Sequence, residues 1–262
     1  MIDVNQADIA EMSVKAVKNR AIGFSVEVYP ELCAILDQDK RVAVKNLSKS
    51  LLNQYLKYQK LIEKLSRMKV IENKCYAEGY HAICGIDEVG RGPLAGPVVC
   101  AAVIMPADSR ILKVDDSKKL SAKMRETLNE RILKEAVAVE FGLKTPEEID
   151  QMNILNATKN AMENAVNAMK AVPDLLLIDA VTINTKVETR AIIHGDAVCY
   201  SIAAASIVAK VYRDKLMKKY HEQYPEYGFD RNMGYGTAEH IAAIKAHGIT
   251  PIHRLSFVKN FI

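Results

Sequence analysis

The first third of the chain carries a helical pattern of apolar residues. Neither Gly nor Pro occurs between Pro30 and Gly79, and this stretch predicts helix. Its apolar residues form a seam along one side of the helix. This seam indicates a helix packed on itself or on the rest of the protein, although an arm that grips DNA or a dimer contact gives the same pattern. Its residues recur every seven positions in two series, Val44, Leu51, Tyr58 and Leu65, and Leu47, Gln54, Leu61 and Met68.

From Ile83 onward, short apolar strands alternate with helices. Strands are predicted at ICGIDEVG and PVVCAAVIM, joined by the loop GRGPLAG, and at VAVEFGLK, LLLID and AIIHGD. One helix is expected from Thr145-Pro146 to about Met169, and others at SAKMRETLNERILKEA, SIAAASIVAKVYRDKLMKKY and AEHIAAIKAHG. This order predicts an α/β fold with a mixed sheet and helices on its faces. We expect a helical, basic N-terminal extension over residues 1–78 and a main domain over residues 79–262.

Charge is unevenly distributed along the 262 residues. The net charge is +4, but residues 40–74 contain ten basic and two acidic side chains, a net charge of +8. Residues 75–262 are neutral overall, with 23 side chains of each sign. A basic block beside a neutral domain suggests an anionic partner.

The composition indicates a cytoplasmic protein. The N-terminus has no basic stretch followed by an apolar core, and no apolar run is long enough to span a membrane. The five cysteines are odd in number and form no CxxC pair, so we expect buried thiols in place of disulfides or a zinc site.

Acidic residues stand where apolar strands end. Asp87 and Glu88 interrupt ICGIDEVG, Asp179 ends LLLID, and Asp196 follows AIIHG just before a long helix. A carboxylate at the end of a buried strand is costly unless it is paired or binds a metal. Converging carboxylates without a Cys or His motif suit Mg²⁺ or Mn²⁺, although helix caps and ion pairs are common alternatives.

Three further segments carry groups suited to phosphates or sugars. In the loop after Glu88, Gly90 and Gly92 permit close backbone approach, and Arg91 between them suits a phosphate. The segment Asp116-Ser117-Lys118-Lys119 offers hydroxyl and ammonium donors, or else caps a charged helix. Tyr235, between two glycines, offers a ring for stacking on a base or sugar, or is a turn tyrosine.

Together these motifs resemble the bacterial ribonuclease HII family. The similarity is carried by GIDEVGRGPLAGPVV at 85–99, DDSKKLS at 115–121, LLIDA at 176–180, GDAVCYSIAAASIVAKVYRD at 195–214, GYGTAEH, and TPIHRLSF near the end. It runs from about residue 80 to the C-terminus with the motifs in family order. The helical basic extension also resembles that of many family members from Gram-positive bacteria.

The resemblance implies a ribonuclease H-like five-stranded sheet and a site of four acids, Asp87, Glu88, Asp179 and Asp196, that holds two Mn²⁺ or Mg²⁺ ions. It implies an endonuclease, a hydrolase, that cuts the RNA strand of RNA/DNA hybrids and cuts 5′ to ribonucleotides in duplex DNA, as in ribonucleotide excision repair. The products would carry 3′-hydroxyl and 5′-phosphate ends. We expect a monomer that binds such duplexes and does not bind a membrane.

The resemblance also assigns substrate contacts. The backbone of Gly90, Arg91 and Gly92 is expected to read the 2′-hydroxyl of the ribonucleotide, and Tyr235 to stack on the next sugar. Further substrate-backbone contacts are implied for Ser117, Lys118, Lys210 and Arg213.

One position departs from the family pattern, and two other functions remain open. His194 stands where a lysine is common, and we expect both His194 and His253 to be structural. A ribonuclease HIII-type hybrid nuclease is one alternative, although residues 31–78 are predicted to be helical where that type carries a β-sheet platform. A catalytically idle hybrid-binding module is the other, although a cluster of acids does not help to bind a polyanion.

Overall fold

The computed structural model describes residues 5–260, and the chain divides into two compact units between Ser66 and Arg67. The division falls inside the long helix α4 (Val42–Met68). Among the described residues, no helix has the length and apolar character needed to cross a membrane.

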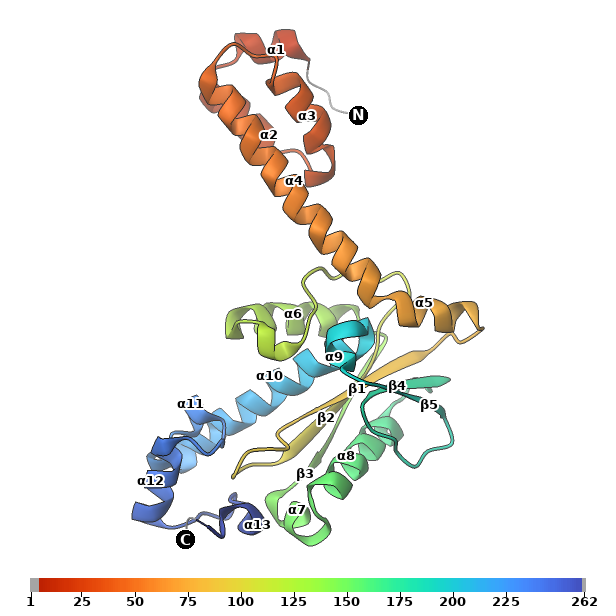
Figure 1. Ribbon diagram of the computed structural model, residues 1–262, viewed down its shortest axis with the longest axis vertical. Helices are drawn as coiled ribbons and strands as arrows, with labels where there is room; N and C mark the ends of the chain where they lie inside the picture. Colours follow the sequence, from red (N-terminus) through yellow and green to blue (C-terminus); the bar gives the residue numbers. More distant parts are fainter. Residues whose placement is uncertain (1–4, 261–262) are drawn as a thin grey trace. The chain divides into compact units, whose positions relative to one another are not determined.

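The N-terminal unit is a small helical bundle (Figure 1). The helices α1 (Gln6–Glu11), α2 (Val14–Ile22) and α3 (Tyr29–Leu36), with the 3₁₀ turn η1 (Val26–Val28), pack on the first half of α4. Their shared core includes Ile9, Val17, Leu32, Leu36, Val44 and Leu51. The first half of the predicted seam is therefore used inside this unit, where Val44 and Leu51 are buried.

The predicted helix between Pro30 and Gly79 is interrupted at residues 37–41. The carboxylate of Asp39 accepts hydrogen bonds from the backbone N–H of Arg41, at 2.7 Å, and from the Arg41 Nε–H, at 2.9 Å. An acidic side chain that bonds its own local backbone competes with helical hydrogen bonding and starts the next helix. The pattern of apolar residues does not predict this turn.

The second unit is built on a five-stranded sheet in the order β3-β2-β1-β4-β5. Its central strand β1 (Ile83–Val89) pairs antiparallel with β2 (Val98–Ile104) and parallel with β4 (Leu175–Asp179). The outer strand β3 (Ala138–Lys144) is antiparallel to β2, and β5 (Glu188–Ile192) is parallel to β4. The predicted mixed sheet of five strands with flanking helices is confirmed.

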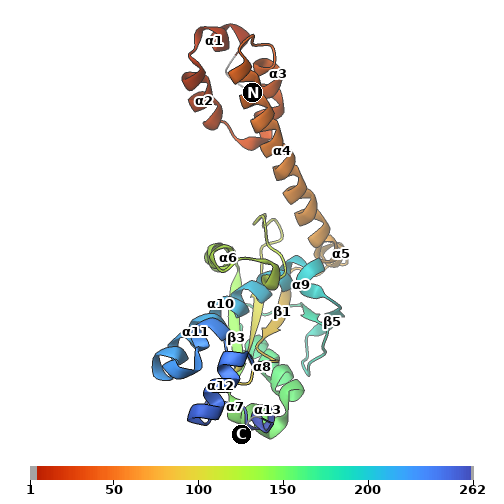
Figure 2. The same cartoon turned by 60° about the vertical axis from the view of Figure 1, so that its left-hand side comes forward.

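Helices cover both faces of the sheet (Figures 1 and 2). On one face, α8 (Ile154–Ala168) packs on Cys84 and Ile86 of β1 and on the facing residues of β2. On the other, α10 (Tyr200–Gln223) crosses β1 at Gly85, where a Cβ would lie 2.1 Å from the Ser201 carbonyl carbon. The alanine-rich face of α10 is buried, so this helix lies close against the strand that carries Asp87 and Glu88.

The helix predicted to run from Pro146 to about Met169 is two helices, α7 (Pro146–Met152) and α8. Asn153 between them adopts a left-handed φ of 68° and accepts a hydrogen bond from the Asn156 N–H. Its ψ of 161° lies outside the helical regions and ends α7, and its side chain caps the second helix, so the chain turns without Gly or Pro. The expected helix start at Thr145-Pro146 is confirmed, and Thr145 and Glu148 form a capping box there.

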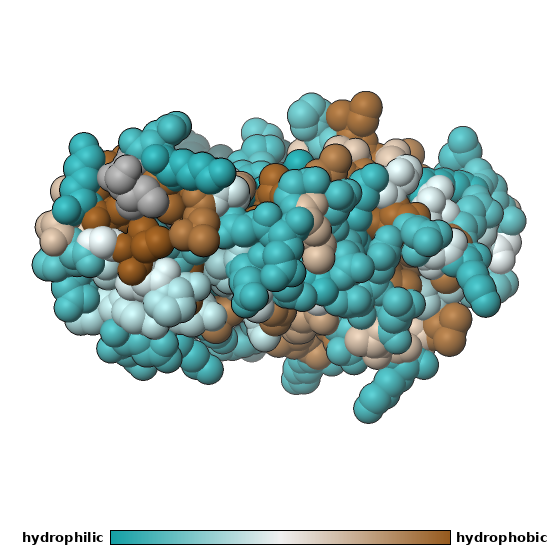
Figure 3. Space-filling view, turned by 90° about the horizontal axis from the view of Figure 1, so that it is seen from below, coloured by the Kyte–Doolittle hydropathy of each residue, from teal (hydrophilic) through white to brown (hydrophobic). Residues whose placement is uncertain are grey.

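The remaining elements complete the second unit. Helix α5 (Val70–Ala77) belongs to it, because Cys75 packs with Ile83, Leu175 and Leu177. Helix α6 (Ala122–Glu135) lies along α10, and α11 (Phe229–Asn232), α12 (Ala238–His247) and α13 (Leu255–Val258) form the C-terminal part. The surface seen from below in Figure 3 is largely hydrophilic, with separate apolar patches. All five cysteines, Cys33, Cys75, Cys84, Cys100 and Cys199, are buried free thiols, as predicted.

Candidate active site

The first two acids lie at the carboxyl end of β1. Asp87 points to the α10 face, is 5 % exposed, and accepts a hydrogen bond from Ser206 of that helix. Glu88, the next residue, faces the other side of the sheet and is half-buried. Their position near the strand end allows both carboxylates to face the same edge of the sheet.

The third and fourth acids are joined through one turn. Asp179 ends β4, the parallel neighbour of β1, and its Oδ1 accepts a hydrogen bond of 2.7 Å from the Gly195 N–H. Asp196 follows Gly195 in the short helix α9 (Gly195–Val198) and is 9 % exposed. Because parallel strands end at one edge, this turn brings Asp196 to the edge that holds Asp87 and Asp179.

Burial and mutual repulsion perturb these carboxyl groups. Burial raises the pKa of Asp87 well above its usual range, and the nearby charges of Glu88 and Asp179 raise it further. Burial also raises the pKa of Glu88, where Asp179 adds to the effect and Arg91 opposes it. The pKa of Asp196 is raised by burial, then by the charges of Asp116 and Asp179. Asp179 therefore lies within electrostatic reach of the other three acids.

The donor set fits a hard divalent cation. Ionised carboxylates are acceptors only, and no cation within the site neutralises all of them. The nearest ammonium and guanidinium groups are Lys118 Nζ, 3.9 Å from Asp196 Oδ2, and Arg91 Nη1, 3.6 Å from Glu88 Oε1. Within residues 5–260, no three His, Cys, Asp or Glu side chains are arranged as a finished ligand set for one ion. A cation would have to draw these oxygens together.

The segment around Ser117 differs from its predicted role. Ser117 is 4 % exposed, and its Oγ lies at hydrogen-bond distance, 3.0 Å, from Ser206 Oγ. The hydroxyl predicted to contact substrate is thus used inside the protein, next to the serine that holds Asp87. Lys118 has an 83 % exposed side chain at the site and remains available to a phosphate.

Asp116 is a fifth acid that the sequence interpretation did not place in the site. Its Oδ1 caps the 3₁₀ turn η2 (Ser117–Lys119) by accepting from the Lys118 N–H at 2.9 Å. Its carboxylate also raises the pKa of Asp196. The signal is present in the DDSKK motif, in which Asp116 directly precedes Ser117 and Lys118.

The glycine-rich loop and Tyr235 lie side by side. A Cβ built on Gly92 would meet only the Tyr235 ring, with Cε1 at 3.7 Å. Gly92 and Arg91 are exposed, and Tyr235 is 44 % exposed. Gly90 differs, because its φ of 93° and a Cβ position 2.2 Å from Arg213 Nε exclude a side chain. The backbone of the loop and the aromatic ring therefore form one accessible surface next to Glu88.

Two buried arginines hold this loop from below. Arg213 is 0 % exposed and donates to the carbonyl oxygens of Pro97, Met233 and Ala95 at 2.9–3.1 Å. The prediction that it contacts substrate phosphates is wrong, because its guanidinium is fully used inside the protein. Arg254, which the sequence interpretation missed, is also 0 % exposed and donates to the carbonyls of Gly90, Arg91 and Gly96 at 2.5–3.0 Å.

Lys210 is paired within α10. Its Nζ donates to Asp214 Oδ1 at 2.6 Å, and its side chain is 17 % exposed. Asp214 also lies 3.8 Å from Arg125 Nη2. A phosphate would have to compete with this carboxylate, so substrate contact by Lys210 stays a prediction.

A histidine pair supports the backbone of Tyr235. The Thr250 N–H donates to His253 Nδ1 at 2.9 Å, so the neutral His253 ring carries its proton on Nε2. That nitrogen lies 3.0 Å from His240 Nε2, and His240 Nδ1 donates to the Tyr235 carbonyl at 2.9 Å. His253 is buried and structural, as expected, whereas His194 is exposed in a left-handed turn before α9.

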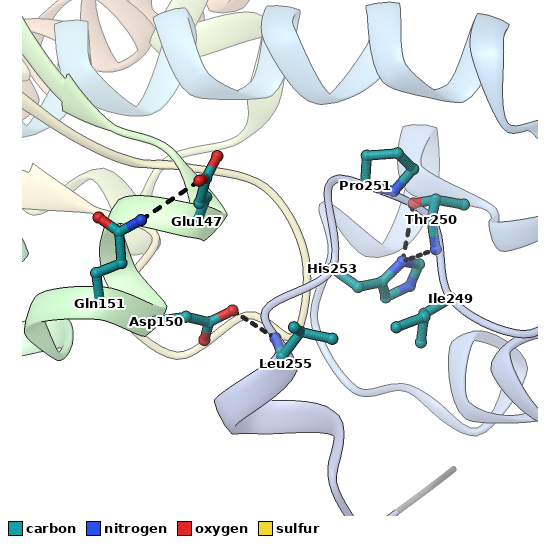
Figure 4. Close-up of a pocket in the computed structure, with 8 residues that line it drawn as sticks. All are labelled: Glu147, Asp150, Gln151, Ile249, Thr250, Pro251, His253 and Leu255. Carbon is teal, nitrogen blue, oxygen red and sulfur yellow. Dashed lines mark hydrogen bonds between the residues drawn. The ribbon is translucent and has the colours of Figure 1, made fainter.

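A pocket of about 570 Å³ lies away from the acids, between α7 and the C-terminal segment (Figure 4). It contains none of the four predicted acids or the glycine-rich loop. Its lining residues are Glu147, Asp150, Gln151, Ile249, Thr250, Pro251, His253 and Leu255. Asp150 there accepts from the backbone N–H groups of Leu255 and Ser256, which joins α7 to α13.

Known proteins with similar sequences and folds cover both units. The family model "Ribonuclease HII" matches residues 84–260, and "Ribonuclease HII N-terminal domain" matches residues 13–76. Ribonuclease HII of Acetivibrio thermocellus is 45 % identical over 97 % of this chain and 100 % of its own length. The corresponding protein of Clostridioides difficile is 47 % identical over 96 % and 99 %. The crystal structure of ribonuclease H2 from Pyrococcus horikoshii aligns with a TM-score of 0.59 and 27 % identity, over 68 % of this chain and 96 % of that one.

Proposed function

The chain belongs to the ribonuclease HII family and is a hydrolytic endoribonuclease with ribonuclease H activity, and from this premise we propose how and where it cuts. Its substrates are RNA/DNA hybrids and duplex DNA with embedded ribonucleotides, cut on the 5′ side of a ribonucleotide. The observation that carries the proposal is the convergence of Asp87, Glu88, Asp179 and Asp196 at one sheet edge, beside an exposed glycine-rich loop.

Asp87, Glu88, Asp179 and Asp196 would hold two divalent cations, Mn²⁺ or Mg²⁺. When bound, the ions would supply an activated water and neutralise charge on the leaving 3′-oxygen, giving 3′-hydroxyl and 5′-phosphate ends. Neighbouring residues of the chain orient the acids before the metal-dependent step. Ser206 orients Asp87, and the Gly195 N–H orients Asp179. Lys118, 3.9 Å from Asp196, and Arg91, 3.6 Å from Glu88, would neutralise phosphate oxygens beside the acids.

Selection of a ribonucleotide would come from the loop and the ring together. Backbone groups of the loop can approach a 2′-hydroxyl because no side chain at the exposed Gly92 stands in the way, while Gly90 allows the loop to lie directly on Arg213. Arg254 holds the carbonyls of Gly90 and Arg91 from the buried side, and Arg213 holds those of Ala95 and Pro97 in the same loop, which lowers the cost of ordering the loop on binding. Tyr235 would stack on the sugar that follows.

The direct test is a cleavage assay on three duplexes of one sequence: all DNA, one embedded ribonucleotide, and four. We expect Mn²⁺-dependent cleavage of the last two at the 5′ side of a ribonucleotide, with ends that a DNA ligase assay and phosphatase treatment identify. Cleavage of the four-ribonucleotide duplex alone would contradict recognition of a single ribonucleotide. Cleavage of the all-DNA duplex would contradict reading of the 2′-hydroxyl.

Gly92→Val tests the loop separately from the fold. A Cβ at Gly92 has only one neighbour within 4 Å and no strained φ, so the variant is expected to fold normally. The bulk should block the ribonucleotide and leave affinity for an all-DNA duplex unchanged, since that affinity comes from phosphate contacts. Equal loss of cleavage and of all-DNA binding would refute the role of the loop. Gly90 is unsuitable for this test, because a side chain there collides with Arg213.

A further inference from the structure

Glu72, in helix α5, is a buried acid that the proposed function does not use. Glu72 is only 3 % exposed. Its Oε1 accepts three hydrogen bonds, from the Ser201 N–H at 2.7 Å, Ser201 Oγ at 3.0 Å and Cys199 Sγ at 3.1 Å. Its Oε2 has no hydrogen-bond partner within the part of the chain that the structure describes. A carboxylate held in this way is costly to bury, so its partners indicate what it does.

All three donors lie at the first turn of α10. Cys199, the N-cap residue of this 24-residue helix, provides no side-chain cap. Glu72 supplies the missing acceptor from another helix and places negative charge where the helix dipole favours it. The contact therefore fixes the start of α10 relative to α5.

The start of α10 is continuous with the turn that carries the fourth acid. The Cys199 N–H donates to the Gly195 carbonyl at 2.8 Å, and the Gly195 N–H donates to Asp179. Asp196 lies within this turn, three residues before Cys199. A shift at the first turn of α10 would thus move Asp196 relative to Asp179.

We propose that Glu72 is a positioning residue that, by capping α10 from α5, sets the place of Asp196 in the candidate metal site. The proposal rests on the proposed function, since it takes Asp196 as a metal ligand. The proposal also moves Glu72 from the N-terminal extension to the catalytic unit. The sequence placed Glu72 in the extension over residues 1–78, whereas its contacts make it part of the catalytic unit. A chain that starts near Cys75 would lack this cap.

The test uses the full chain with Glu72→Ala and Glu72→Gln. Glu78→Ala is the matched control, because it removes a carboxylate just after the same helix, and that carboxylate pairs with Arg190 of β5. For each protein we would measure Mn²⁺ affinity by calorimetry, kcat and KM for a single-ribonucleotide duplex, and Tm. Glu72→Ala should weaken Mn²⁺ binding by about 10- to 100-fold and lower kcat at fixed Mn²⁺, with KM for the duplex unchanged. The Mn²⁺ affinity and kcat of Glu72→Gln should lie between those of the wild type and Glu72→Ala, since the amide oxygen can still accept a hydrogen bond from Ser201.

The results separate three cases. If both Glu72 variants lose Tm but bind Mn²⁺ and turn over like the wild type, Glu72 is merely structural and the proposal is refuted. If Glu72→Ala does not fold, the Mn²⁺ affinity of Glu72→Gln decides, and an unchanged affinity refutes the proposal. Asp196→Asn tests the premise itself: unchanged Mn²⁺ affinity and cleavage in that variant would overturn the proposed function, whatever Glu72 does. Glu78→Ala should match the wild type in Mn²⁺ affinity and kcat.

Discussion

Replacing Arg254 with Met removes the guanidinium that holds the glycine-rich loop and keeps a side chain of similar length. The change deletes four hydrogen bonds and leaves three carbonyl oxygens, those of Gly90, Arg91 and Gly96, without this donor. Hydrogen bonds from a charged donor contribute about 1.5–3 kcal/mol each, so their loss costs about 6–12 kcal/mol. We expect the variant to fold less stably and to lose loop order.

Part of that loss is offset, because the variant no longer buries a charge. Burial, reinforced by the charge of Arg213, lowers the pKa of Arg254 from 12.5 to about 9. A shift of this size corresponds to about 5 kcal/mol of unfavourable charge burial. The net loss of unfolding free energy is then about 4 kcal/mol. Breaking a buried charged contact typically costs about 3–5 kcal/mol, which agrees with this value. For a chain of this size it lowers Tm by about 8–16 °C.

The assay is thermal unfolding followed by cleavage at a temperature where the variant is folded. Arg231→Met is the matched control, since Arg231 has a 59 % exposed side chain and pairs with Asp230 and Glu239 at the surface. The control should change stability by less than about 1 kcal/mol. Arg254→Lys should recover only part of the loss, because an ammonium cannot reach three carbonyls in a fixed fork. A Tm of Arg254→Met within about 2 °C of the wild type would refute this account of the loop.

Substitutions at four further positions test the site and the fold. Asp87→Asn should lower cleavage by at least about 100-fold and leave the metal-free Tm equal or higher, because repulsion from Glu88 is relieved; substantial residual cleavage contradicts the assignment. Tyr235→Ala should lose about tenfold in kcat/KM and Tyr235→Phe little, whereas equal losses would implicate the hydroxyl. Burial and the neighbouring His240 lower the pKa of His253 to about 4, so its contribution to stability is present above pH 6.5 and is lost as the pH falls toward 4. The wild type should therefore lose about 2 kcal/mol more than His253→Gln between pH 7 and pH 5 in denaturant titrations, and parallel pH profiles would exclude this. Lys49→Ala in α4 should reduce the log-log salt slope of duplex binding by about one unit if this exposed lysine contacts a phosphate, and an unchanged slope would rule that contact out.

Periodic features of this fold could be predicted from the sequence. The strands β1, β2 and β4 are short apolar runs, whereas β5 (ETRAI) is not, and Asp87 and Asp179 mark two strand ends that the parallel pairing brings together. The helix breaks at residues 37–41 and at Asn153 could not be predicted in the same way. Both depend on a polar side chain bonding to nearby backbone, which leaves the apolar pattern unchanged.

The supporting arginines show a second limit. Arg254 acts on carbonyls more than 150 residues earlier in the chain, and nothing in its local sequence separates it from a surface arginine near a phosphate. The substrate contact that the resemblance implied for Arg213 fails for the same reason, because its position in the sequence does not show that the guanidinium is buried. Glu72 is a similar case, because its partners lie in a different sequence motif.

The buried thiols provide a way to follow opening of each unit separately. Cys33 packs in the core of the N-terminal unit, while Cys75, Cys84, Cys100 and Cys199 lie in the second. Burial raises the pKa of Cys84 to about 12, and raises that of Cys100 and Cys199 as well, so these sulfurs resist alkylation in the native state. Pulsed alkylation read by peptide mass spectrometry would then report two opening rates from one sample. Cys199, bonded to Glu72 at the start of α10, would report when the helix beside the acids first comes free.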